Sequence, residues 1–120
     1  MRSFLIAVSF AALSATAAFA GDEVMAGYIG NTAIVTGGMT ETRTYYNADH
    51  TFTLKAPSFG MTWKGTWKID GANLCRTYEK APPGVPNPFC TPAEAHKAGD
   101  SWTMTLDGKT RTVSLVKGVQ

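Results

Sequence analysis

The residues best suited to chemistry are few and widely spaced. His50 follows Asp49 in a polar turn, and His96 stands between Glu94 and Asp100. Metal-binding motifs place their ligands closely, as in HxH or HExxH, and neither spacing occurs. We therefore interpret both histidines as solvated loop residues, and we expect neither a metal ion nor a cofactor.

A second candidate is the pair formed by Glu41 and Arg43, which fall on the same face of a predicted strand. Projecting into a barrel cavity, they could act as general acid and cation. An ion-paired or solvated strand face is the simpler interpretation. No Gly-x-Ser-x-Gly elbow, P-loop or GxGxxG motif occurs. The sequence thus favours a protein that is not an enzyme, with a small barrel enzyme using Glu41, Arg43 or the histidines as the alternative.

The two cysteines, Cys75 and Cys90, are expected to form a structural disulfide. CxxC spacing is absent, and two cysteines do not make a zinc site. In the chain-entropy model, a bridge that closes a loop of about 15 residues stabilises the fold by about 3 kcal/mol.

Residues 1–20 have the three parts of a secretory signal peptide: Arg2, an apolar stretch from Phe4 to Phe19, and the small-x-small site Ala18-Phe19-Ala20. The apolar run is shorter than the roughly 20 residues that favour a membrane span. We predict cleavage after Ala20, which leaves residues 21–120 as a single β domain. An exported bacterial chain of this kind is periplasmic or secreted, where a disulfide persists.

The charge balance of the mature chain is close to neutral. Without Arg2, the eleven Lys and Arg of the full chain become ten, against nine Asp and Glu. A net charge of +1 gives no electrostatic footprint for nucleic acid or for an anionic membrane. No stretch after Ala20 is apolar enough to span a bilayer. The expected partner is therefore an unknown small apolar ligand or a periplasmic protein.

The strand that is predicted to organise the fold is Met61 to Asp70. Its residues alternate between two faces along its whole length. Met61, Trp63, Gly65, Trp67 and Ile69 share one face, and polar residues share the other. A period of two is typical of a strand with one buried face. Gly65, between two tryptophans, indicates a place where the strand bends or a ring lies on the backbone.

Further strands are predicted on both sides of this one, mostly joined by hairpins. Asp70-Gly71 and Asp107-Gly108 are tight-turn signals. Consecutive hairpins favour a small antiparallel up-and-down barrel or strongly curled meander of seven or eight strands, and a two-sheet sandwich is the alternative. The predicted ranges are 31–36, 41–47, 51–56, 61–70, 73–78, 101–106 and 109–116.

Two short helices are also predicted. Asp22 and the spacing of the following apolar residues favour a helix within residues 22–30, which would cover the open end of the sheet. Thr91-Pro92-Ala93-Glu94 has the form of a capping box, which predicts a helical turn through about Lys97.

Two surfaces are candidates for binding. If the barrel is hollow, its aromatic side chains would line an apolar ligand site, although an eight-stranded barrel is narrow enough to be filled by side chains. The other candidate is the proline-rich loop at residues 79–88, whose stiffness reduces the entropy lost on docking. The residues are Tyr46, Trp63, Trp67 and Trp102 for the ligand, and Tyr78, Pro83, Pro86 and Phe89 for a partner.

Two segments resemble a known group of proteins. Tyr46-Asn47-Ala48-Asp49-His50-Thr51 resembles a Y-x-x-D-G-T hairpin with histidine in place of glycine, and Gly65-Thr66-Trp67 is followed by Gly71 and Leu74-Cys75. In this order they resemble small exported bacterial proteins of uncharacterised function with a lipocalin-like meander. The resemblance implies a periplasmic β protein and brings no catalytic residues.

The sequence therefore favours a non-enzymatic periplasmic module that binds a small apolar ligand or a partner protein, including an inhibitor of an enzyme. The alternatives are the small barrel enzyme and a structural or stress-related accessory protein of the cell envelope.

Overall fold

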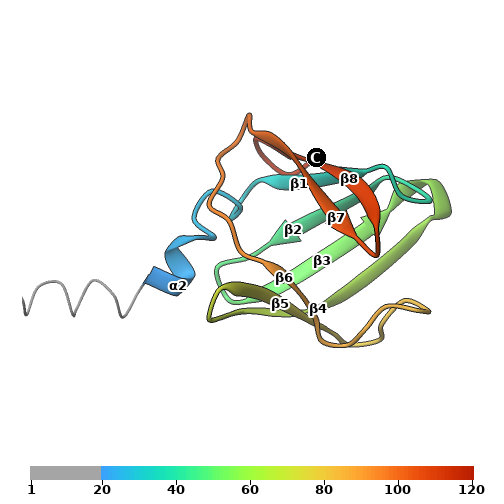
Figure 1. Cartoon of the computed structure of the whole chain (residues 1–120), viewed down its shortest axis with the longest axis horizontal. Coiled ribbons are helices and arrows are strands. Elements are labelled where there is room, and N and C mark those ends of the chain that lie inside the picture. Colours follow the sequence, from blue (N-terminus) through green and yellow to red (C-terminus); the bar gives the residue numbers. More distant parts are fainter. Residues whose placement is uncertain (1–19) are drawn as a thin grey trace, which may run out of the picture.

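The computed structural model describes residues 20–120, so the predicted signal peptide lies outside the described residues except for Ala20. Figure 1 shows a single curled sheet with a short helix at one end. The elements are α2 (Ala20–Glu23), β1 (Thr32–Thr36), β2 (Thr42–Tyr46), β3 (Thr51–Ala56), the 3-10 turn η1 (Pro57–Phe59), β4 (Met61–Asp70), β5 (Asn73–Tyr78), β6 (Phe89–Pro92), β7 (Ser101–Leu106) and β8 (Lys109–Val116).

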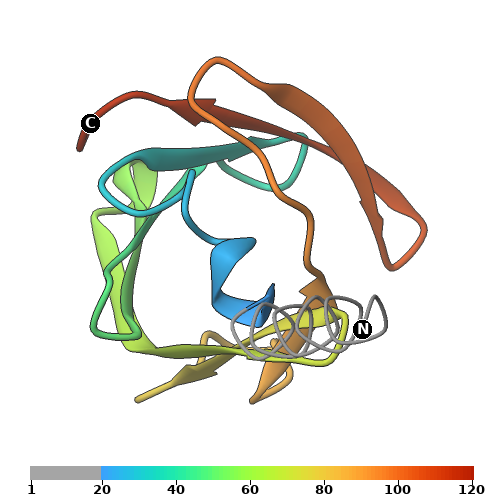
Figure 2. The same ribbon diagram turned by 90° about the vertical axis from the view of Figure 1, so that its left-hand side faces the viewer.

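The eight strands pair in the order β6-β5-β4-β3-β2-β1-β8-β7, and every pair is antiparallel. This is the order of an up-and-down barrel opened at one place, between β6 and β7. The strongly curled meander is thus confirmed, as a half-barrel (Figure 2). The two-sheet sandwich is not what the chain forms, because all eight strands belong to one sheet.

The alternation of β4 sets the inside and outside of this half-barrel. Gly65 and Trp67 are buried and Trp63 and Ile69 are half-buried, whereas every second residue between them is exposed. Gly65 has no room for a side chain, because a Cβ there would overlap the carbonyl oxygen of Thr77 and lie 2.8 Å from the ring of Phe52. The prediction that a ring rests on the backbone at Gly65 is confirmed.

The N-terminal segment enters the half-barrel instead of lying outside it. The α-helix ends at Glu23, after a single turn, and hydrogen-bonded turns continue to Tyr28. The α-helix is thus shorter than the predicted one, which lay within residues 22–30. Gly27 passes so close to the backbone of His96 that no Cβ fits between them. Met25 and Tyr28 are buried among the core residues, and Figure 2 shows this segment within the ring of strands.

The helical turn predicted for residues 91–97 is wrong. Thr91 and Pro92 belong to β6, and residues 93–97 have no regular structure. The Cys75–Cys90 disulfide joins two residues that are direct partners in the β5–β6 ladder, so the tertiary pairing overrides the local capping pattern. Pro92 is tolerated because β6 is an edge strand, which needs no N–H donor on its open side.

The half-barrel has two distinct ends, which are visible in Figure 1. The plug end carries α2, the turns at 47–50 and 71–72, the segment 93–100 and residues 117–120. The loop end carries the connections at 37–41, 57–60, 79–88 and 107–108.

Replacing Gly65 by alanine tests this packing. We expect Gly65→Ala to lower the free energy of unfolding by about 2–3 kcal/mol, because the added methyl group must displace backbone or the Phe52 ring. Chemical denaturation measures the change. The neighbouring exposed Thr66→Ala is the control and should cost less than about 1 kcal/mol. Equal effects for the two variants would contradict the close approach.

Candidate functional site

The strongest candidate site is the loop at residues 79–88, which we call the stapled loop. Its two ends are joined by the Cys75–Cys90 disulfide between β5 and β6. A second clamp is formed by the side chain of Asn87, which accepts a hydrogen bond from the Tyr78 amide at 2.9 Å and donates one to the Tyr78 carbonyl at 3.1 Å. These connections fix the two ends of the loop, and the half-buried side chains of Ala81 and Val85 pack against the core.

Within the stapled loop, a turn is closed by the amide of Val85, which donates to the carbonyl of Pro82 at 3.2 Å. Gly84 has a φ of 79°, a conformation that glycine adopts without strain. Pro83 and Pro86 are exposed, as the partner-binding prediction requires. Tyr78 is buried and Phe89 is half-buried, so these two residues anchor the loop and do not form its surface.

Three of the four aromatic residues predicted to bind a ligand, Tyr46, Trp67 and Trp102, are in contact with other rings. Tyr46 meets Trp67 edge-on, with ring centroids 6.4 Å apart, and Tyr28 reaches both Tyr46 and Trp102, at 5.8 and 6.3 Å. Tyr46 and Trp67 are buried, and Trp63 and Trp102 are half-buried. Edge-to-face contacts of this kind are favourable packing.

Sequence reasoning missed Arg76, whose side chain lies on the inner face. Its guanidinium carbon is 5.2 Å from the ring centroid of Phe89 and 5.9 Å from those of Phe52 and Tyr78. Cation–π attraction stabilises a charge placed among rings in this way. The period of two along β5 indicates this position, because Arg76 falls on the same face as the inward-facing Leu74 and Tyr78.

The His96 side chain is fixed by three neighbours. Its ring stacks on Trp102 at 3.4 Å, Nδ1 lies 3.3 Å from Asp100 Oδ2, and Nε2 lies 3.1 Å from Glu94 Oε1. Both ring nitrogens therefore contact carboxylates, and neither faces a serine as a catalytic base would. The role is structural: His96 ties the segment 93–100 to β7.

The His50 side chain does the same for the N-terminal segment. It stacks on Trp67 with ring centroids 4.0 Å apart, and Nε2 lies 3.0 Å from Asp22 Oδ2. Both histidines were expected to be solvated loop residues. The structure instead uses each to join a loop to a tryptophan at the plug end.

The Glu41–Arg43 pair is an ion pair, with Oε2 and Nε 3.0 Å apart. It lies on the outer face of β2, opposite the buried Thr44 and Tyr46. It is also at the loop end, whereas both histidines are at the plug end. The residues named for the alternative enzyme therefore do not converge on one pocket.

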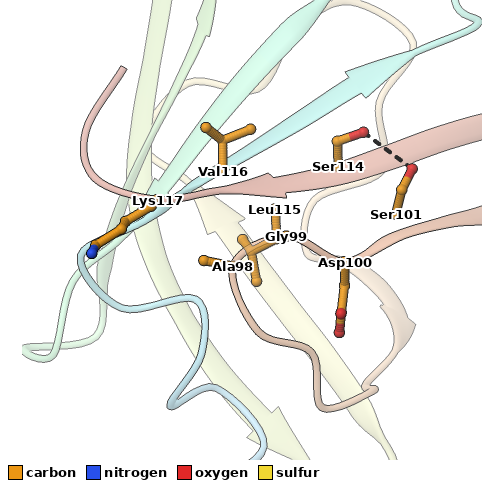
Figure 3. A pocket seen from close by; sticks show the side chains of 8 residues that line it. All are labelled: Ala98, Gly99, Asp100, Ser101, Ser114, Leu115, Val116 and Lys117. Carbon is orange, nitrogen blue, oxygen red and sulfur yellow. Dashed lines mark hydrogen bonds between the residues drawn. The ribbon is translucent and has the colours of Figure 1, made fainter.

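One shallow hollow of about 430 Å³ lies at the start of β7 and the end of β8 (Figure 3). Ser101 and Ser114 line it, and their hydroxyl oxygens are 3.2 Å apart. Asp100 also lines it, but its carboxylate already accepts a hydrogen bond from the Lys97 amide at 3.1 Å. Among residues 20–120, no group of three or more His, Cys, Asp or Glu side chains is arranged to hold a metal ion.

Several pKa values are shifted by local contacts. The hydroxyl and amide of Thr51 hold the pKa of Asp49 below its usual value, and the Lys97 amide and His96 do the same for Asp100. Burial raises the pKa of Tyr78, and the nearby Arg76 opposes that rise. Burial also raises the pKa of Tyr28 well above its usual value, with Tyr46 and Glu94 adding to the effect.

Comparison with known proteins identifies no relative. No family model, no curated protein and no solved structure matches the chain. The resemblance to lipocalin-like meanders therefore stays a prediction. Over the part of the chain that the structure describes, none of the helices has the length and apolar character needed to cross a bilayer.

The raised pKa of Tyr28 leads to a prediction about alkaline stability. Its hydroxyl donates to the Glu94 carbonyl at 2.9 Å, which an ionised phenolate cannot do. The pKa is higher in the folded than in the unfolded state, so this stabilisation is full below about pH 10 and is lost as the pH rises further. We expect Tyr28→Phe to be about 1 kcal/mol less stable at pH 7 and to lose less stability between pH 9 and 11. Denaturant unfolding at each pH measures this, and parallel profiles for the two proteins would contradict it.

Proposed function

We propose that the mature chain is a non-enzymatic binding module of the periplasm or the cell exterior, and that it recognises a partner protein through the stapled loop. The observation that carries the proposal is the combination of exposure and fixation: Pro83 and Pro86 are solvent-exposed on a loop held by a disulfide and by the Asn87 clamp. A loop already held in one conformation loses little entropy on binding.

Three further observations support a protein partner over the other readings. An interior ligand would have to displace Tyr46 and Trp67, which are buried in ring-to-ring contacts. A barrel enzyme would need convergent acid–base groups, and the Glu41–Arg43 pair lies at the opposite end from both histidines. A purely structural accessory protein would have no need to fix an exposed loop so firmly. An inhibitor that inserts this loop into an enzyme cleft is one form that such a module could take.

The test is site-specific photo-cross-linking in the exported-protein fraction of the native cell. A photoreactive residue replaces Pro83 in one version of the oxidised mature chain. In the matched control it replaces Lys117, which is exposed at the plug end. We expect a discrete cross-linked product from position 83 only.

A second variant, Cys75→Ser with Cys90→Ser, separates loop rigidity from loop sequence. We expect this variant to remain folded but about 3 kcal/mol less stable, and to yield less of the position-83 product. Identical products from positions 83 and 117, or no product from position 83, would overturn the proposal.

A further inference from the structure

The fold sorts charges that the sequence leaves mixed. The registers of the strands place six cations and three carboxylates in the half of the barrel nearer the loop end. The half nearer the plug end holds six carboxylates and three cations, with Arg76 on the inner face near the middle. The first set is Arg43, Lys55, Lys64, Lys80, Lys109 and Arg111 with Glu41, Glu79 and Asp107, and the second is Asp22, Glu23, Asp49, Asp70, Glu94 and Asp100 with Lys68, Lys97 and Lys117.

The loop end also carries most of the large exposed apolar side chains. Met39, in the β1–β2 connection, is 92% exposed, and Phe59 and Met61, at the β3–β4 connection, are 53% and 47% exposed. They stand on two separate hairpins. An apolar side chain projecting from a polar loop gains nothing in water, but it can enter the boundary between lipid headgroups and acyl chains.

Cations lie directly behind these apolar residues on the outer wall. Arg43 on β2 pairs with Lys55 on β3, and Lys64 lies on the neighbouring strand β4, where it pairs with Thr53. Lys55 extends its ammonium group over the ring of Tyr45, 5.6 Å from the ring centroid. Arg111 reaches the β1–β2 connection, where it donates to the carbonyl of Gly37 at 3.3 Å.

We propose that the loop end docks on the surface of an anionic lipid bilayer. Met39, Phe59 and Met61 enter the interface, and the surrounding Lys and Arg side chains contact lipid phosphates. These exposed apolar side chains, which we call the apolar tips, stand on two separate hairpins. This favours a fluid lipid surface over an acidic protein, because a protein interface needs a contiguous buried core. This inference goes beyond the proposed function, and it would place a partner held by the stapled loop beside the membrane.

The test is co-sedimentation of the oxidised mature chain with vesicles of phosphatidylcholine and phosphatidylglycerol in equal parts, and with phosphatidylcholine alone. We expect binding to the anionic vesicles at 0.05 M salt and its loss at 1 M, where the Debye length is about 3 Å. Binding measured this way does not depend on any partner protein, so it succeeds or fails separately from the cross-linking test.

Two matched charge variants locate the docking face. Lys64→Glu with Lys109→Glu alters the loop end, and Lys68→Glu with Lys117→Glu makes the same change in net charge nearer the plug end; all four lysines are exposed. Each cation near an anionic surface strengthens association roughly fivefold, so the first variant should lose at least about 25-fold in binding. The second should lose less than about threefold, because its lysines lie roughly 25–30 Å from the loop end by strand rise, beyond a Debye length.

A second pair of variants tests the apolar tips. We expect Met39→Ser with Phe59→Ser to weaken vesicle binding about tenfold, and Val119→Ser, which alters a 74% exposed residue at the plug end, to leave it unchanged. Circular dichroism checks that each variant is folded. Equal losses for the two charge variants, or no binding to anionic vesicles at low salt, would overturn the proposal. Binding of wild-type protein to polyglutamate but not to vesicles would replace the bilayer with an acidic protein.

Discussion

The hydroxyl of Tyr28 donates to the carbonyl oxygen of Glu94 from inside the half-barrel, and this contact joins the two segments that fill the gap in the sheet. Because β6 and β7 do not pair with each other, the curled sheet alone would leave its inner face open to water. Tyr28 also meets the ring of Tyr46 on β2 and the ring of Trp102 on β7, which is the strand at one side of the gap. Burial of the N-terminal segment therefore takes the place of the missing ladder.

The two ends of the half-barrel differ in their contacts and in their charge. The plug end is closed by short contacts, among them the stacking of His50 on Trp67 and of His96 on Trp102, and its net charge is negative. The loop end carries most of the large exposed apolar side chains, a net positive charge and a loop whose ends are joined by the Cys75–Cys90 disulfide. The same strands that build the core thus separate a stabilising end from an end suited to binding.

The sequence predicts the strands well because each reports its own burial through a period of two. The β4 alternation and the position of Gly65 within it could be predicted in this way, and the disulfide could be predicted from the two cysteines of an exported chain. The failures are places where partners distant in sequence decide. Thr91-Pro92 has the sequence of a helix start, but Cys90 pairs with Cys75 in the β5–β6 ladder. The N-terminal helix ends at Glu23, and the chain then passes with Gly27 against the backbone of His96, which is distant in sequence. The separation of charge between the two ends can be recognised only when the register of every strand is known. The net charge of the chain, which is near zero, does not indicate it.

The claim that the N-terminal segment is buried inside the half-barrel can be tested directly. Methionine methyl groups labelled with carbon-13 report their own exposure when a soluble paramagnetic agent is added to the protein. Met25 is 1% exposed, whereas Met39 and Met61 are 92% and 47% exposed. The account predicts strong broadening of the Met39 and Met61 signals and an unchanged Met25 signal. Broadening of Met25 to the same degree would mean that the segment lies outside the barrel, and that the barrel is hollow.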